Sequence, residues 1–249
     1  MKKFFVFVAA MFTLVSCSAI LEQEEEQIEE TRMVNKFKQI HILGSPTVIY
    51  TQGSKCSVKV KAPKSIVKKV STVCKGDRLE IETKGVINFW GFNSGGNYDR
   101  VTVYVTSPDI TGVELNGSGD FTSDKPIDTD NISLTVRGSG DISLKGHLIC
   151  DNAQLQVTGS GDLEVSDLEA LTSKVVLIGS GDLSVRQRNV KNTRIELTGS
   201  GDISVECLHC DRLDSQLTGS GDISISGTVR KIDKVKAGSG SYNLNLEQR

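Results

Sequence analysis

The chain repeats one tetrapeptide, Gly-Ser-Gly-Asp, at nearly constant intervals through its C-terminal half. Successive copies are 21, 21, 20, 20, 20 and 19 residues apart, the last being a Gly-Ser-Gly-Ser variant, and they begin at Gly117, Gly138, Gly159, Gly179, Gly199, Gly219 and Gly238. A fixed period near 20 residues indicates one structural unit stacked on itself. This feature constrains the fold of residues 117–249 far more than it constrains their function.

Within each unit, apolar residues alternate with polar ones, which is the pattern of a β-strand. The alternation begins at the aspartate of the Gly-Ser-Gly-Asp motif, where we expect the chain to turn a corner, as in Asp141–Leu144. It returns late in the unit, as at Leu134 and Val136. A weaker third stretch carries a single apolar residue, such as Ile149, Leu168, Val190 or Leu208. A unit of this length is too short to contain a helix, so we predict an all-β fold in which three-sided coils stack as a β-helix (a β-solenoid).

Stacking would place the aspartates of successive corners about 4.8 Å apart. The resulting ladder contains Asp120, Asp141, Asp162, Asp182, Asp202 and Asp222. Neighbouring charges would repel by roughly 1 kcal/mol in water, which hydrogen bonds from turn amides could offset. We expect a structural ladder. Calcium is the alternative, although calcium-binding β-rolls use a different glycine pattern on a nine-residue period.

The first residues differ from the body of the chain. Met1-Lys2-Lys3 is basic, and residues 4–15 are apolar but too few to span a bilayer. Leu14-Val15-Ser16-Cys17 resembles the lipobox of bacterial lipoproteins. We expect residues 1–16 to be a signal peptide and Cys17 to carry lipid, such as palmitate, that attaches the protein to a membrane. An ordinary signal peptide with an incidental cysteine is the alternative.

Six glutamates crowd into nine residues after this cysteine: Glu22, Glu24, Glu25, Glu26, Glu29 and Glu30. Because like charges repel, we expect residues 17–34 to form a flexible tether. The run also resembles the acidic tract of surface-exported lipoproteins of Bacteroidota-type bacteria. That resemblance implies an outer-membrane lipoprotein exposed at the cell surface, with a periplasm-facing protein or a plain solvated tether as alternatives. Without leader and tether the body carries a formal charge near +2, which gives no electrostatic case for nucleic acid.

Five further cysteines follow: Cys56, Cys74, Cys150, Cys207 and Cys210. An odd number leaves at least one thiol unpaired within the chain. Cys56 could pair with Cys74, and the Cys-x-x-Cys pair at 207 and 210 could form a local disulfide or bury two small side chains. A zinc site needs about four ligands, and no second Cys/His pair lies nearby in sequence. We therefore expect no metal and no cofactor.

Residues 35–116 also alternate in the manner of β-strands, and they contain one aromatic, glycine-rich stretch. Residues 88–98 hold four of the nine aromatics in residues 31–249: Phe89, Trp90, Phe92 and Tyr98. Exposed aromatics on such a loop could bind a sugar or anchor a partner protein. The alternative is a loop folded over an open end of the core.

Three segments together resemble the head GIN domain, or putative auto-transporter adhesin, family. They are residues 37–53, residues 101–120 and the Gly-Ser-Gly-Asp array. The resemblance covers roughly residues 35–247. It implies a right-handed, single-stranded parallel β-helix in which residues 35–116 continue or cap the stack formed by residues 117–249. The family has no established catalytic residues.

These features favour a non-enzymatic, adhesin-like module that binds a glycan or protein ligand. A self-associating structural envelope protein, forming homo-oligomers through the β-helix ends, is one alternative. A carbohydrate-active β-helix enzyme is another, but it would need converging carboxylates. The acids outside the corners, such as Glu164, Glu196 and Glu206, are scattered at outward positions, and only three histidines are present. We therefore expect no catalytic residues.

Overall fold

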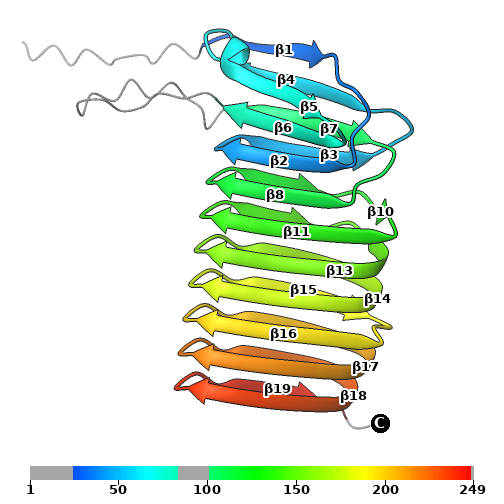
Figure 1. The fold of residues 1–249 in the computed structure, drawn as a ribbon, viewed down its shortest axis with the longest axis vertical. Coiled ribbons are helices and arrows are strands. Elements are labelled where there is room, and N and C mark those ends of the chain that lie inside the picture. The colour runs from blue at the N-terminus through cyan, green and yellow to red at the C-terminus, as the bar shows by residue number, and fades with distance from the viewer. Residues whose placement is uncertain (1–24, 84–100, 248–249) are drawn as a thin grey trace, which may run out of the picture.

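The computed structural model describes residues 25–83 and 101–247, which form an all-β rod (Figure 1). The strands belong to one continuous sheet that winds into a parallel β-solenoid. The predicted all-β β-helix with coils of about 20 residues is confirmed. Among the described residues, no helix is long and apolar enough to cross a membrane.

The elements follow one another along the chain with short turns between them. They are β1 (Gln27–Arg32), β2 (Gln39–Gly44), β3 (Thr47–Gln52), β4 (Ser57–Pro63), the 3₁₀ turn η1 (Val67–Lys69), β5 (Val70–Lys75), β6 (Arg78–Thr83), β7 (Thr102–Ser107), β8 (Gly112–Gly117), β9 (Asp120–Ser123), β10 (Ile127–Asp128), β11 (Asn131–Gly138), β12 (Asp141–Leu144), β13 (Leu148–Gly159), β14 (Leu163–Gly179), β15 (Leu183–Arg188), β16 (Asn192–Gly199), β17 (Ile203–Gly219), β18 (Ile223–Gly238) and β19 (Tyr242–Leu246).

Successive coils stack in register, so that equivalent residues lie directly above one another. Leu134 pairs with Leu155, Leu155 with Val175, and Val175 with Ile195. Each of these side chains is at most 1% exposed. Because alternate residues of a strand point to opposite faces, the same positions of every coil line one continuous apolar core.

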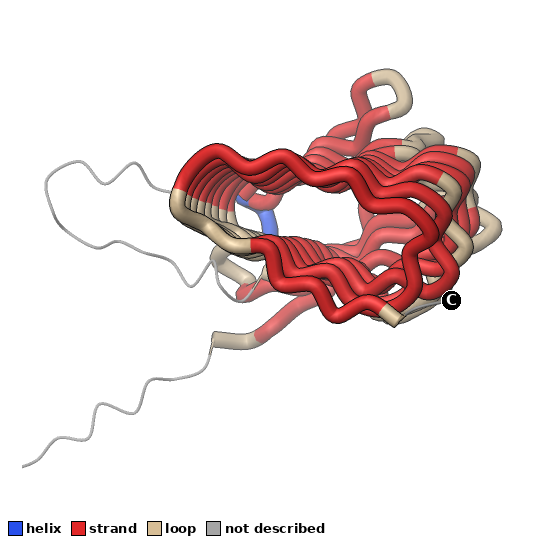
Figure 2. The backbone as a smooth tube through the Cα atoms, turned by 90° about the horizontal axis from the view of Figure 1, so that it is seen from below, coloured by secondary structure: helices blue, strands red, loops and turns tan. Residues whose placement is uncertain are grey.

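The corners need both glycines of the Gly-Ser-Gly motif. Gly179 has a φ of +139°, and a Cβ there would collide with the carbonyl oxygen of Gly159 in the coil above. A Cβ on Gly181 would collide in the same way with the carbonyl of Gly161. The corners lie one behind another when the rod is viewed along its axis (Figure 2). The glycines therefore recur because the backbones of successive coils approach one another too closely at the corners for a side chain to fit.

The solenoid begins before the repeated motif. Strands β2 and β3 form a coil whose corner is Gly44-Ser45-Pro46, where Gly44 has a φ of +94° and its carbonyl accepts a 3.0 Å hydrogen bond from the N–H of Ser118. Strand β2 pairs in parallel with both β6 and β8. This coil therefore lies between two coils that come later in the sequence, and no structural boundary falls between residues 116 and 117.

The N-terminal end of the stack is closed by an antiparallel layer. Strand β4 pairs antiparallel with β7, β1 with β4, and β5 with β6. The turn η1 contributes Val67, which is fully buried. The N-terminal strands thus both continue the stack and cap it (Figure 1).

The prediction of a flexible tether over residues 17–34 is wrong for Gln27–Arg32, which form β1. The acidic side chains find partners on the neighbouring segment. Lys59 lies 3.1 Å from Glu29, and Ser65 donates its backbone N–H to Glu25 over 2.8 Å. Because Lys59 of β4 offsets part of the repulsion between the glutamates, this part of the acidic run adds an edge strand to the cap.

The third side of each coil differs in detail from the sequence expectation. Leu168 and Val190 are fully buried, but Ile149 is 40% exposed. Strand β13 continues its alternation through the bend, so the inward residues there are Leu148 and Cys150. Small buried cysteines take the place of aliphatic residues at these positions, which a search for large apolar residues overlooks.

The C-terminal end carries lysines where other coils carry core residues. In the register of β17 and β18, Lys234 lies below Ser215 and Lys236 below Leu217. Ser215 is 5% exposed and Leu217 is fully buried. Inward-pointing charges at an edge oppose the addition of a further strand. These lysines therefore oppose the stacking of another coil on the last one.

Candidate functional site

The corner aspartates are connected by hydrogen bonds along the rod. The backbone N–H of Asp162 donates to the carboxylate of Asp141 over 2.9 Å, and Asp182 donates in the same way to Asp162 over 2.8 Å. The pattern continues to Asp222, whose carboxylate accepts from the N–H of Ser241 over 2.7 Å. Each carboxylate therefore satisfies an amide of the next coil, which gives the aspartate a structural reason to recur.

The ladder offers no preformed metal cage in the part of the chain that the structure describes. No group of three or more His, Cys, Asp or Glu side chains is placed to hold an ion there. At the upper end of the ladder, burial raises the pKa of Asp120, and the neighbouring charge of Asp141 adds to this shift. A raised carboxyl pKa is the ordinary result of desolvation and like charge.

Two predicted sites fall outside the described residues. They are Cys17, expected to carry lipid, and the aromatic loop with Phe89, Trp90, Phe92 and Tyr98. Both remain predictions.

The five cysteines of the body are free thiols. Cys207 and Cys210 are buried on the third side of the coil, where the side-chain amide of Gln187 lies 3.4 and 3.6 Å from their sulfur atoms. The same amide donates a 2.7 Å hydrogen bond to Thr193. The contact with Cys210, followed by burial, raises the pKa of Cys207. This cluster is a buried polar patch within the core.

The acids that an enzyme would need do not converge. The carboxylate of Glu196 contacts Arg194, and that of Glu206 lies 3.5 Å from Arg186. Glu164 accepts hydrogen bonds from Ser143 and Ser166 on the outer face of the coil. Glu164, Glu196 and Glu206 are therefore each engaged by their own neighbours.

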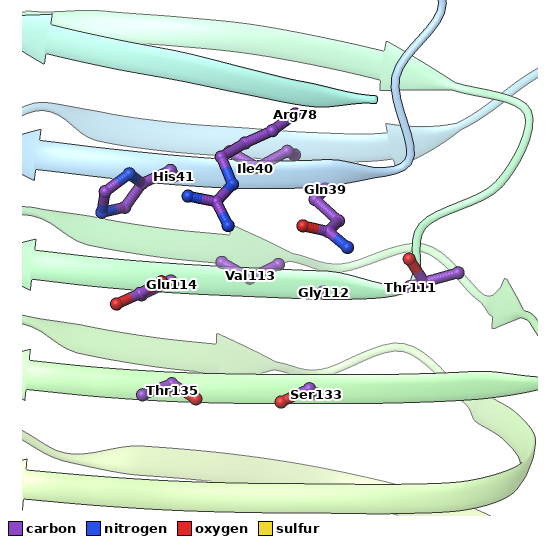
Figure 3. Close-up of a pocket in the computed structure, with 10 residues that line it drawn as sticks. All are labelled: Gln39, Ile40, His41, Arg78, Thr111, Gly112, Val113, Glu114, Ser133 and Thr135. Atoms are coloured by element: carbon purple, nitrogen blue, oxygen red, sulfur yellow. The ribbon is translucent and has the colours of Figure 1, made fainter. Parts of the chain in front are cut away.

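A hollow of about 200 Å³, with both polar and apolar lining, lies on the outer face where the N-terminal cap meets the regular rod (Figure 3). The strands β6, β2, β8 and β11 supply its lining, apart from Thr111, which directly precedes β8. The residues are Gln39, Ile40, His41, Arg78, Thr111, Gly112, Val113, Glu114, Ser133 and Thr135. The hollow exists because position 112, directly between Gln39 and Ser133 in the sheet, has no side chain.

Arg78 differs from the other arginines of the described chain. Each of the seven others lies within 4.0 Å of a carboxylate; they are Arg32, Arg137, Arg186, Arg188, Arg194, Arg212 and Arg230. Arg78 is half-buried, extends over the hollow (Figure 3), and forms no ion pair with any described residue. Its guanidinium is therefore the one arginine charge left available to a ligand in this part of the molecule.

Two of the other groups around the hollow, Glu114 and the Nε2 atom of His41, are already engaged. Arg137 donates a 3.1 Å hydrogen bond to Glu114, and Asn116 contacts the Nε2 atom of His41 over 2.6 Å. The Nδ1 atom of His41 is buried and has no hydrogen-bond partner among the described residues. The side of the hollow nearest β8 is thus neutral, and the positive charge of Arg78 dominates it.

This hollow is not evident from the sequence, because its residues are distributed from position 39 to position 135. One signal could have revealed it. Aligning the corner at Gly44 with that at Gly117 places Gln39 above Gly112 and His41 above Glu114. The alignment was not available from the tetrapeptide alone, because the first corner reads Gly-Ser-Pro.

Solved structures share this architecture. The chain is similar to a putative adhesin from Bacteroides fragilis at 20% identity, with a TM-score of 0.72 over 88% of this chain and 97% of that one. It is similar to a putative lipid binding protein from Parabacteroides distasonis at 24% identity, with a TM-score of 0.72 over 89% and 97%. A putative adhesin from Parabacteroides merdae gives 15% identity and a TM-score of 0.70 over 91% and 98%. At these identities the likeness shows the fold alone.

No curated protein matches the sequence. The family model described as putative auto-transporter adhesin, head GIN domain, matches residues 36–205 and, in a second match, residues 171–246. Together these matches span the whole solenoid. The chain therefore belongs to the putative auto-transporter adhesin, head GIN domain, family.

Proposed function

We propose that this protein is an adhesin-like binding module, held at the outer membrane by lipid on Cys17 and displayed at the cell surface. The family assignment supports a binding role and indicates no enzyme family. The lipobox-like Leu14–Cys17 and the acidic run that follows support the anchor and the surface location.

One observation carries the binding role: the hollow around Gly112. Elsewhere on the described rod the arginines are paired with carboxylates, as Arg212 is with Asp214 and Asp233. At the hollow an unpaired guanidinium and several hydroxyl and amide groups face solvent together. Concave sites with a few convergent polar groups are where ligands bind by default.

The location is tested by digestion of intact cells with an external protease, using a periplasmic protein as the lysis control. Degradation of the full-length protein is expected. Protection would place the rod in the periplasm and contradict the adhesin role. Replacing Cys17→Ala should abolish incorporation of a labelled fatty acid, whereas replacing Ser18→Ala should leave it unchanged.

The binding role is tested separately, by measuring attachment of cells that carry the full-length protein to immobilised glycans and host proteins. Attachment should require the gene and be lost when residues of the hollow are replaced. Equal attachment with and without the protein would remove the binding role whatever its location.

A further inference from the structure

We propose that the hollow binds a saccharide unit that carries a carboxylate, with Arg78 as the residue that selects the charge. This inference rests on the proposed function and names the ligand class of the same site. The residues of the hollow on which the argument rests are Gln39, Arg78, Gly112, Ser133 and Thr135.

The charge of the hollow favours an anion. Among the charged groups nearest to it, Glu114 is paired with Arg137, and Glu80 is paired with Lys75 over 2.6 Å. Both carboxylates are thereby neutralised by partners outside the hollow. Arg78 remains as the excess positive charge, so a neutral ligand would leave it unsatisfied and a cation would be repelled.

The geometry of the guanidinium favours a carboxylate. Arginine presents its N–H donors as a planar fork that matches the two oxygens of a carboxylate. Arg78 projects from β6 across β2 towards Val113, so that its guanidinium lies between His41 and Gln39, while the side chain nearest to Gly112 is that of Gln39 (Figure 3). The half-buried position of the side chain lowers the conformational entropy lost on binding.

The remaining lining favours a sugar. Ser133 and Thr135 offer hydroxyl groups and Gln39 an amide, and none of the three makes a side-chain hydrogen bond to a described residue. Such groups can donate to and accept from the hydroxyls of a saccharide. With a volume of about 200 Å³, the hollow is smaller than the pockets that enclose a whole drug-sized ligand. It suits one unit of a longer chain that continues along the outer face of the rod.

Position 112 allows the hollow to be filled without strain. A Cβ at Gly112 would lie 3.6 Å from the carbonyl oxygen of Ser133 and 3.8 Å from Cγ of Gln39, which are ordinary van der Waals distances. The strand therefore has room for a Cβ at this position, and Gly112→Val places two further methyl groups in the hollow. Arg78→Gln removes the charge, and Arg78→Lys keeps the charge but removes the fork.

The test uses full-length protein purified in detergent and matched immobilised oligosaccharides. One series ends in glucuronic acid, a second in glucose, and a third in a sulfated glucose. We expect binding to the glucuronic acid series that falls at least about ten-fold in Arg78→Gln and in Gly112→Val, since the lost contact is a charge-assisted hydrogen bond. The matched control Arg186→Gln, which removes an exposed arginine paired with Glu206, should bind like the parent. Thermal melts establish that each variant is folded.

The outcomes separate the inference from the proposed function. Equal binding of the glucose and glucuronic acid series, unaffected by Arg78→Gln, would overturn the carboxylate while leaving an adhesin that binds neutral glycans. Preference for the sulfated series would also overturn it. Binding only to anionic lipid vesicles, or no saccharide binding while cells still attach to host protein, would overturn the saccharide and keep a binding role.

Discussion

The ammonium nitrogen of Lys234 lies 5.3 Å from the centroid of the Tyr242 ring, across the open end of the core. The Tyr242 hydroxyl in turn donates to the backbone carbonyl of Val235 over 3.0 Å. A second lysine, Lys236, donates to the carbonyl of Gly240 over 2.9 Å. Both lysines occupy core positions of the repeat, so they cover the last apolar layer and place charge where another coil would dock.

This arrangement predicts that the C-terminal end prevents self-association. The double variant Lys234→Val/Lys236→Leu restores the apolar pattern and exposes an uncharged edge, which is a template for strand addition. Light scattering after gel filtration should show a monomer for the parent and concentration-dependent dimers or larger species for the variant.

The matched control is Lys145→Val/Lys191→Leu, which adds the same apolar groups at exposed positions on the side of the rod. It should remain monomeric. If parent and both variants associate equally, the lysines do not govern the end, and the alternative of a self-associating envelope protein gains support.

A second prediction concerns the corner glycines. Gly179→Ala must adopt a φ of +139° and would collide with the carbonyl of Gly159. We expect a loss of about 2–4 kcal/mol in the free energy of unfolding, because backbone strain and steric overlap act together. Urea denaturation measures this loss. Ser180→Ala in the same corner, at an exposed side chain, should change stability by less than about 0.5 kcal/mol; equal losses would show that the corner is not the strained element.

The repeat made the fold predictable because a stacked unit repeats its packing solution. Each Gly-Ser-Gly marks a corner, and each alternating stretch marks an inward row. The first coil was harder to recognise because Pro46 replaces the second glycine of its corner. The predicted tether extends too far, over Gln27–Arg32, because the run of glutamates does not by itself reveal that Lys59 of β4 pairs with Glu29.

The candidate site was not predictable in the same way. Gln39, Arg78, Gly112 and Ser133 meet only because β2 is inserted between β6 and β8. Local patterns report residues that are close in sequence, whereas this insertion is a long-range pairing. The hollow thus depends on the insertion of β2 between two later strands, which the repeat does not predict. The aspartate ladder, in contrast, follows directly from the repeat.

A third prediction follows from the aspartate ladder. Asp202 accepts the N–H of Asp222 over 2.9 Å, so Asp202→Ala should cost about 0.5–2 kcal/mol, as for other side-chain caps of backbone amides. Asp202→Asn keeps an oxygen acceptor and should cost less. If the ladder is structural, the melting temperature of the parent should be the same in calcium as in chelator. A calcium-dependent rise that Asp202→Asn abolishes would instead establish a metal site.

A fourth prediction concerns acid stability. The hydrogen bond from Lys38, followed by that from Thr129, holds the pKa of Asp109 below its ordinary value of 3.8. A carboxyl whose pKa is lower in the folded state stabilises the fold above its unfolded pKa, and this contribution is lost as the pH falls through the folded pKa. Parent and Asp109→Asn should therefore differ by about 0.2–1 kcal/mol at pH 6, as expected for a partly exposed ion pair, and converge towards pH 3. Urea titrations at the two pH values measure the difference; a constant difference would show that ionisation of Asp109 is not involved.

The last prediction concerns the buried thiols. Burial raises the pKa of Cys150 to about 12, and the contact with Cys210 together with burial raises that of Cys207. Because the thiolate is the reactive form, these cysteines should resist a maleimide at pH 8 in the folded protein. They should react fully in urea, whereas the half-buried Cys56 and Cys74 should react before unfolding. Mass spectrometry of labelled peptides distinguishes the sites.

Labelling of Cys207 in the folded protein would contradict its burial. Labelling of Cys207 and Cys210 in urea only after a reductant is added would show that the two cysteines are joined as a disulfide.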